Sequence, residues 1–369
     1  MECLVHQAWS DGVKHMVNYI IRRLLLMPVT VFGVTVLIFG MLQFLQPVDR
    51  AALYVRDIPK NAGALQGIIL KYGLNDPIPL QYWHWLVGRP DPETGQLVGG
   101  IVRGDFGYSR YASEPVIDLV KARFPATIEL TVYSVIPILA IGIWLGVLSA
   151  VNQNNPIDQF ARIFSIVGYS FPTFVFGLLV LMLFYANLRW FPPGRISDWA
   201  NAVIRSPSWH NYTYLLTVDS LLNLRLDIFL DAVRHLFLPV LTLSYVSWAQ
   251  FLRVTRSSML ETLRQDYVVT ARAKGLRERD VVNQHARPNA LIPVATLGGL
   301  TIAGLLGGAV LTETIFNFPG VGSAAAAAAS QLDVITVLSF TLLAGLVLVL
   351  SNLGVDVLYA FLDPRVRLG

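Results

Sequence analysis

The residues with the most chemical character form a charged segment from Asp266 to Pro288, between two long apolar stretches. Its first part reads Asp-Tyr-Val-Val-Thr-Ala-Arg-Ala-Lys-Gly and ends at Gly275. Asp266 could serve as a helix N-cap by accepting hydrogen bonds from first-turn amides, and Gly275 could take the left-handed conformation that ends a helix. The segment therefore predicts a helix of roughly two turns, followed by a second helix from Arg277 onward.

The side chains of this helix fall into two groups at helical spacing. Tyr267, Val268 and Ala271 are placed on one face, while Thr270 and Ala273 offer a small surface that another chain could approach closely. Such a helix could insert into a groove on a soluble partner and carry force to the adjoining apolar segments. A helix-turn-helix loop with solvated charges is equally compatible with these residues, so both interpretations stay open at this point.

The chain lacks the motifs of an enzyme that binds nucleotide or zinc by itself. It contains no Gly-x-x-x-x-Gly-Lys-Ser/Thr phosphate loop and no His-Glu-x-x-His helix. Its single cysteine, Cys3, excludes an intramolecular disulfide and a multi-cysteine metal site. The net charge of +4 is dispersed rather than gathered in a basic block, which argues against nucleic-acid binding. We therefore expect no catalytic residue, no metal site and no cofactor in this chain.

The composition is that of a membrane protein. Of the 369 residues, 54% are hydrophobic and 14% are charged, whereas soluble domains carry about 25% charged residues. The expected fold class is all-α and integral to the membrane, surrounded by lipid, with six transmembrane helices crossing a core of ~30 Å. The six apolar segments span residues 24–45, 126–151, 160–188, 235–252, 291–311 and 334–362.

The segments between these helices predict the orientation of the chain in the cell membrane. Six crossings put both termini on one side, and the basic residues in the short loops and tails predict that this side is cytoplasmic. The N-terminal segment 1–23, in which Met16 could be the native start, and the charged loop 253–289 are then cytoplasmic. The longer segments 46–125 and 189–234 become outer loops, and the first is expected to be a folded cap with short helices.

Two glycine pairs have the spacing that lets helices pack closely in lipid. Gly142 and Gly146 form one pair, and Gly304 and Gly308 form the other. Glycine is also common in membrane helices, so either pair alone is a weak signal.

Three acidic residues lie in or near the apolar segments. Glu129 and Glu313 are near the outer ends of their segments, and we expect solvation at the helix ends to explain both. Asp356 lies near the inner end of the last segment, where an interhelical hydrogen bond is a better explanation than a substrate or proton site.

The charged segment resembles the EAA loop of ABC importer permeases, which is a Glu-Ala-Ala triad followed by a glycine and a closing proline. Val269-Thr-Ala271 stands at the triad, Gly275 at the glycine and Pro288 at the proline. The sequence departs from the pattern at Val269, which replaces the glutamate, and at His285 and Arg287, which replace hydrophobic residues.

Further stretches resemble, in the same order, the dipeptide/oligopeptide-type permeases of that family. They are Tyr19-Ile-Ile-Arg-Arg-Leu, Gly104-Asp-Phe-Gly107, Pro125-Ala-Thr-Ile-Glu129-Leu, Glu313-Thr-Ile-Phe-Asn-Phe-Pro-Gly320 and Asp356-Val-Leu-Tyr-Ala-Phe-Leu-Asp-Pro-Arg365. The resemblance covers the chain from about Met16 to its end, and residues 126–362 correspond to the permease domain.

The resemblance implies an importer that works by alternating access. It implies a heterodimer with a second related permease subunit, two ATPase subunits that bind ATP and magnesium, and an extracytoplasmic solute-binding protein. The coupling contact with the ATPases is then expected at a set of residues in the charged segment: Asp266, Tyr267, Thr270, Ala271, Ala273 and Gly275.

The resemblance favours di- or oligopeptides as the solute, with oligosaccharides or nickel as alternatives. A channel or ion-coupled carrier that works without ATP is the alternative of another class. It would need ionisable residues at mid-membrane depth and would have no need of the 253–289 loop.

Overall fold

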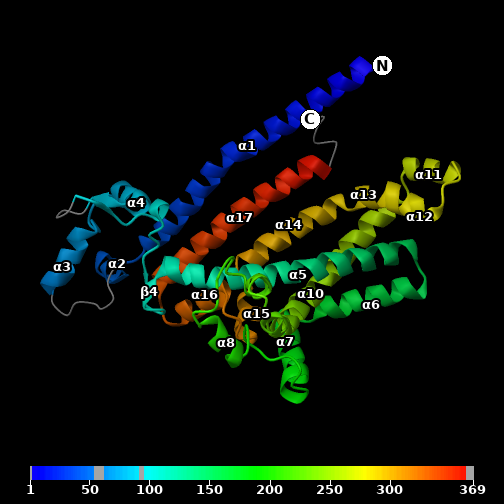
Figure 1. Cartoon of the computed structure of the whole chain (residues 1–369). Coiled ribbons are helices and arrows are strands. Elements are labelled where there is room, and N and C mark those ends of the chain that lie inside the picture. Colours follow the sequence, from blue (N-terminus) through cyan, green and yellow to red (C-terminus); the bar gives the residue numbers. More distant parts are fainter. Residues whose placement is uncertain (1, 54–61, 91–94, 363–369) are drawn as a thin grey trace.

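Long helices dominate the architecture (Figure 1). The computed structural model describes residues 2–53, 62–90 and 95–362. Its four longest helices are α1 (Glu2–Leu42), α5 (Val116–Val151), α10 (Leu226–Thr262) and α17 (Val334–Leu362). The first expected crossing is therefore only the second part of α1, which ends at Leu42.

Shorter elements connect these four helices. The helices are α2 (Pro47–Leu53), α3 (Ala62–Lys71), α4 (Ile78–Val87), η1 (Ile101–Arg103), α6 (Pro156–Ser170), α7 (Thr173–Leu181), η2 (Met182–Asn187), α8 (Asp198–Ile204), α9 (Leu216–Leu222), α11 (Asp266–Ala273), α12 (Glu278–Asp280), η3 (Val281–Ala286), α13 (Arg287–Ala290), α14 (Ile292–Leu306), α15 (Val310–Ile315) and α16 (Val321–Ser330). Two small antiparallel hairpins pair β1 (Arg89–Pro90) with β2 (Leu97–Val98) and β3 (Tyr108–Ser109) with β4 (Glu114–Pro115).

Three described helices are long and apolar enough to cross a membrane, namely residues 21–42 of α1, the whole of α5, and residues 334–355 of α17. Two bent pairs, α6 with α7–η2 and α12–α13 with α14, raise the number of possible spans to five. The expected fourth crossing lies inside α10, which is not among these spans. The chain is thus helical and membrane-embedded, while the count of six crossings stays a prediction.

The expected third crossing is not one continuous helix. Residues 160–188 are divided between α6 and α7–η2, which meet at an angle of 96°. Phe171 is extended, with φ −90° and ψ 123°, and Pro172 follows it. Proline has no amide hydrogen to donate and disfavours the helical conformation of the residue before it, so the helix breaks there.

Close packing of α5 on α10 organises the centre of the fold. A Cβ atom added at Gly142 would lie 2.5 Å from Cβ of Phe251, and one added at Gly146 would lie 2.5 Å from Cβ of Thr255. Neither position therefore accepts a larger side chain, and the predicted packing role of this pair is confirmed.

The second glycine pair does not pack in this way. A Cβ at Gly304 would meet nothing within 4 Å, and Gly308 lies beyond the end of α14 with φ +107°. That prediction is wrong for this chain, because the helix ends before the pair is complete. In α14 it is Gly299 that approaches another helix, α17, against the side chain of Val355.

Both outer acidic residues are buried rather than solvated, so the expectation for them is wrong. Glu129 is 2% exposed and accepts hydrogen bonds from Arg195, at 2.9 and 3.1 Å, and from the Thr217 amide at 2.6 Å. Glu313 is fully buried and accepts from the Thr127 hydroxyl at 3.0 Å. The protein itself replaces the water that these carboxylates lose. The side chain of Asp356 lies outside the described residues.

The described part of the 46–125 segment is folded, as expected, with short helices α2 to α4 and both hairpins. Asp333 connects this segment to α17. Its carboxylate accepts from the Ser109 hydroxyl at 2.9 Å and from both the amide and the hydroxyl of Thr336, at 3.2 and 2.6 Å.

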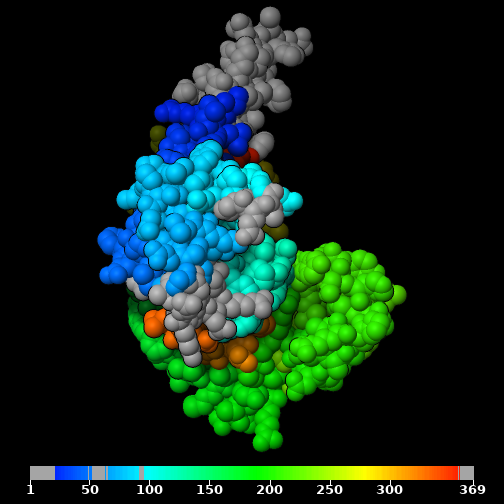
Figure 2. Space-filling view, turned by 90° about the vertical axis from the view of Figure 1, so that its left-hand side faces the viewer, coloured from blue at the N-terminus to red at the C-terminus, as the bar shows by residue number. Residues whose placement is uncertain are grey.

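In Figure 2 the residues of the first loop, coloured blue to cyan, gather in one lobe, while green residues form another.

The two ends of the bundle carry different elements (Figure 1). The start of α1 and the end of α17 lie toward the same end as α11 and α12. The elements α2 to α4, α8 and α16 lie toward the opposite end. The charged segment and the first loop therefore lie toward opposite ends of the bundle.

Candidate coupling site

The charged segment forms the predicted two-turn helix, α11 (Asp266–Ala273), directly after α10. The predicted N-cap is wrong by one residue. Gln265 occupies that position with an extended backbone and makes no side-chain cap bond, while Asp266 lies in the first turn. A carboxylate in the first turn still interacts favourably with the partial positive charge of the helix start.

The predicted end of α11 is confirmed. Gly275 follows the C-cap Lys274 with φ +78°, and its amide donates to the carbonyl of Arg272 at 2.9 Å. A residue with a Cβ adopts this left-handed conformation at an energetic cost, which explains why glycine stands here.

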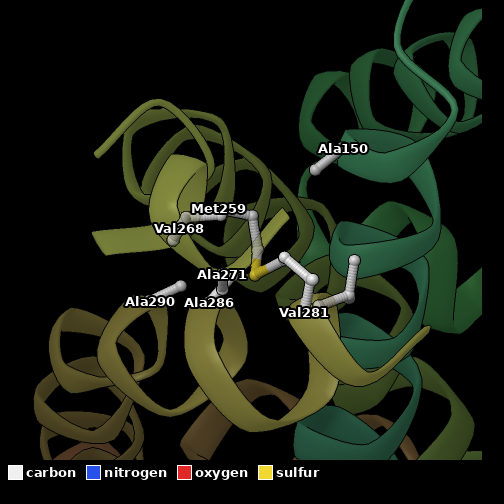
Figure 3. Packing of buried hydrophobic residues seen from close by; sticks show 8 residues of the cluster. Ala150, Met259, Val268, Ala271, Val281, Ala286 and Ala290 are labelled. Atoms are coloured by element: carbon white, nitrogen blue, oxygen red, sulfur yellow. The ribbon is translucent and has the colours of Figure 1, made fainter. Parts of the chain in front are cut away.

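The inner face of α11 consists of Val268 and Ala271, which are 0% and 5% exposed. They belong to a buried cluster that joins α11 to the ends of α5 and α10 and to the returning turn (Figure 3). Its other members are Ala150, Met259, Val281, Val282, Ala286 and Ala290. Small residues predominate, so α11 packs closely on the ends of α5 and α10.

The outer face differs from the expected one. Tyr267 is 44% exposed, and Thr270, Ala273 and Gly275 are exposed as well. Tyr267 therefore does not share the inner face with Val268, contrary to the grouping expected from spacing. Ala271 is 5% exposed and packs in this chain's own cluster, so a contact between Ala271 and an ATPase subunit stays a prediction.

The returning turn is held to α11 by an ion pair. Arg272 donates to both carboxylate oxygens of Glu278, at 3.0 and 2.7 Å, and to the carbonyl of Leu263 at 3.3 Å. The hydrogen bonds to Glu278 raise the pKa of Arg272, which therefore stays charged. The pair is exposed and contributes little to stability, but it joins the last turn of α11 to the start of α12.

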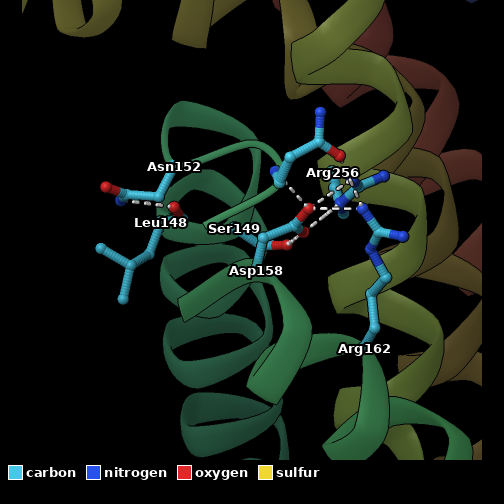
Figure 4. A network of polar contacts seen from close by, with 7 residues as sticks. Leu148, Ser149, Asn152, Asp158, Arg162 and Arg256 are labelled. Carbon is cyan, nitrogen blue, oxygen red and sulfur yellow. Dashed lines mark hydrogen bonds and ion pairs between the residues drawn. The ribbon is translucent and has the colours of Figure 1, made fainter. Parts of the chain in front are cut away.

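A buried carboxylate near the cluster ties three helices together (Figure 4). Asp158, at the start of α6, is fully buried and accepts from Arg256 of α10 at 2.7 and 2.9 Å. It also accepts from Arg162 of its own helix at 2.6 Å and from Ser149 of α5 at 2.5 Å. Two arginines and a hydroxyl compensate the desolvation of this charge.

This ion-pair network adjoins the α11 cluster in sequence and in space. Ser149 precedes the cluster residue Ala150 on α5, and Arg256 lies one turn before Met259 on α10. The sequence contains one local signal of the network, the Asp158 and Arg162 spacing that allows an ion pair within a helix. The partner on α10 follows Asp158 by 98 residues and could not be predicted from spacing.

The described geometry is thus a packed junction between α5, α6, α10 and α11. A short helix with an exposed outer face is packed on the ends of α5 and α10, and a buried ion pair holds those ends to α6. Within the described residues, no group of three or more His, Cys, Asp or Glu side chains could hold a metal ion.

Comparison with known proteins identifies two family matches along this chain. The family described as "Binding-protein-dependent transport system inner membrane component" matches residues 142–368. The description "Binding-prot-dependent transport system membrane comp, N-term" matches residues 16–131. The chain belongs to the binding-protein-dependent transport permeases.

Curated relatives of this chain extend over nearly its full length. The oligopeptide transport system permease protein AppB of Bacillus subtilis (strain 168) is 37% identical over 353 residues, 95% of this chain and 100% of that protein. The probable D,D-dipeptide transport system permease protein DdpB of Escherichia coli (strain K12) is 39% identical over 92% of this chain and 94% of its own length. The dipeptide transport system permease protein DppB of the same strain is 35% identical, over 95% and 99%.

Membership confirms the family inferred from the charged segment and its companion stretches. The relatives are transport permeases rather than enzymes, and the apolar helices of this chain make it an integral membrane permease.

Proposed function

We propose that this permease is one subunit of an ABC importer that moves di- or oligopeptides across the cytoplasmic membrane by alternating access. It pairs with a second, related permease. Two ATPase subunits bind ATP and magnesium below the pair, and an extracytoplasmic binding protein delivers the solute. Both termini and the 253–289 loop lie in the cytoplasm.

The observation that carries the proposal is the two-sided character of α11. Its inner face is buried against α5 and α10, while Tyr267, Thr270 and Ala273 remain exposed on the outside. A docking helix needs both properties, because force from a partner must reach the spanning helices without loss in a flexible loop. A solvated loop would not need a buried inner face.

The position of α11 in the bundle supports the proposed orientation. The start of α1, the end of α17 and α11 gather at one end, whereas the folded first loop lies at the other (Figure 1). ATPases meet α11 only if that end is cytoplasmic, and the first loop then faces the binding protein.

Peptides are favoured as solutes because relatives that cover 92–95% of the chain are named oligopeptide, D,D-dipeptide and dipeptide permeases. Oligosaccharides and nickel remain the alternative solutes.

The docking face is tested by placing a charge on it. In the complete complex reconstituted in vesicles, Thr270→Glu and Ala273→Glu are expected to lower binding-protein-stimulated ATP hydrolysis and dipeptide uptake about tenfold or more. Both side chains are exposed, so the permease itself should fold normally. Unchanged hydrolysis and uptake in both variants would show that α11 does not contact the ATPases.

A matched control places the same charge elsewhere. Ser208 is exposed in the 189–234 segment, and Ser208→Glu is expected to leave ATP hydrolysis and dipeptide uptake unaltered. Gly275→Asp is not a clean test, because an aspartate would be strained at φ +78°.

A further inference from the structure

A cavity of about 290 Å³, lined mainly by apolar side chains with several polar groups among them, lies where the first loop meets the end of α1 and the start of α17. Its wall includes residues from α1, α2, α4, α17 and the four short strands, and from the turns that join them. The wall includes the polar side chains of Gln43, Arg50, Gln81, His84 and Asp105. None of them belongs to the coupling site, which lies at the opposite end of the bundle (Figure 1).

Arg50 supplies a buried positive charge that meets no acidic side chain among the described residues. Its side chain donates to Oε1 of Gln43 at 2.8 Å, to Oε1 of Gln81 at 2.6 Å and to the carbonyl of Leu74 at 3.3 Å. All three acceptors are neutral, and no carboxylate of the described residues pairs with this guanidinium, which is only 8% exposed. A buried cation normally has a counter-charge, because neutral acceptors replace only part of its hydration.

Three buried polar atoms on the cavity wall have no hydrogen-bond partner within the described structure. They are Nε of Arg50, Nε2 of Gln43 and Nδ1 of His84. The first two are donors, and Gln43 is held beside Arg50 by its other amide atom. Unsatisfied buried donors next to an unpaired charge are what an absent anion would leave behind.

The site is held in place before any ligand arrives. Gln81 uses its Nε2 to donate to the carbonyls of Leu74 and Asp76, at 3.0 and 2.6 Å, which directs its Oε1 at Arg50. The side chain of Arg50 is thus fixed by Gln81 on one side and by Gln43 on the other.

The rest of the wall suits an organic ligand rather than a bare inorganic ion. Five aromatic residues face the cavity: Phe39, Tyr72, Trp85, Phe106 and Tyr108. Asp105 is exposed on the rim and provides an acceptor for a ligand cation. A zwitterionic molecule with a carboxylate at Arg50 would satisfy both charges.

We propose that this cavity binds the free carboxylate of a short peptide through Arg50 and Gln43. The choice of a peptide rests on the proposed function, whereas the carboxylate site itself rests on the buried guanidinium and its unsatisfied neighbours. The first loop then takes part in solute recognition in addition to forming the outer cap.

The decisive variant is Gln43→Glu. It keeps the acceptor that Arg50 uses, removes the unsatisfied donor, and puts a carboxylate of the protein beside the guanidinium. The folded loop should be retained, because Arg50 gains a counter-charge. Gln66→Glu is the matched control, since Gln66 is exposed on α3 of the same loop and lies away from the cavity wall.

Binding is measured on the permease complex in lipid nanodiscs, without binding protein or ATP, by saturation-transfer NMR with L-alanyl-L-alanine as the probe. We expect saturable binding to the unaltered complex and to Gln66→Glu, and binding at least about tenfold weaker in Gln43→Glu. The C-terminal amide of the dipeptide should bind to the unaltered complex as weakly as the dipeptide itself binds to Gln43→Glu. Inorganic phosphate should not displace the dipeptide from the unaltered complex at equal concentration.

Equal binding of the dipeptide and its amide, or no effect of Gln43→Glu, would overturn the proposal. Displacement by phosphate at equal concentration would also overturn it, because the site would then recognise any anion. These results are independent of transport. A complex that imports dipeptides but shows no effect of Gln43→Glu on binding would refute the cavity and leave the proposed function intact.

Discussion

The hydroxyl of Thr127 donates a 3.0 Å hydrogen bond to the carboxylate of Glu313, which lies 186 residues further along the chain. Thr127 also accepts from the Val321 amide at 2.9 Å, and the Ser323 amide donates to Glu313 at 2.8 Å. A Cβ at Gly320 would lie 2.3 Å from the carboxyl carbon of Glu313. Two stretches that resemble the family separately thus form one buried junction between α5 and α15–α16.

The first prediction concerns this junction. Thr127→Val removes a donor and an acceptor from a buried site, so it should lower the free energy of unfolding by about 1–3 kcal/mol, since buried polar partners are left unsatisfied. Thr127→Ser keeps the hydroxyl and should lose much less. Thermal unfolding of the purified permease measures both, and equal losses would show that the hydroxyl does not contribute.

The second prediction separates the two glycine pairs. Gly142→Ala should destabilise the protein by about 1–3 kcal/mol, because the added methyl group would overlap with Phe251 and push α10 away. Gly304→Ala should have little effect on the stability of the protein, since no atom lies within 4 Å of the added carbon. Thermal stability of the two variants in the same detergent is the measurement. Similar losses would contradict the packing described for α5 and α10.

The third prediction concerns the ion-pair network. Arg256→Lys keeps the charge but cannot make two parallel hydrogen bonds to Asp158, so we expect a loss of about 1–3 kcal/mol in stability. Binding-protein-stimulated ATP hydrolysis in the complex should fall as well, because the ends of α5, α6 and α10 would no longer move together. Full stability and activity of Arg256→Lys would show that one hydrogen bond is sufficient.

The fourth prediction distinguishes the inner and outer faces of α11. Ala271→Glu would bury a charge in the cluster and should detach the segment, so trypsin should cleave faster at Arg272 and Lys274 in the purified permease. Ala273→Glu leaves the cleavage rate unchanged, because that side chain is exposed. If both variants were cleaved equally fast, the assignment of the two faces would be wrong.

Local features were accessible from the sequence. The bounds and length of α11, the left-handed Gly275 and the close-packing pair Gly142 and Gly146 all depend on a residue's own conformational preferences or on neighbours within about one turn. The overall character of the chain as a helical membrane permease also followed from apolar segments and from motifs in order.

What only the tertiary structure decided is which residues face each other across helices. Ala271 is buried and Tyr267 exposed because α11 is rotated toward Met259 and Ala150, and no spacing within α11 determines that rotation. Asp158 meets Arg256 because α6 and α10 pack side by side. Local preference determines whether a helix forms, while the neighbours that it buries determine which side of it remains available to a partner.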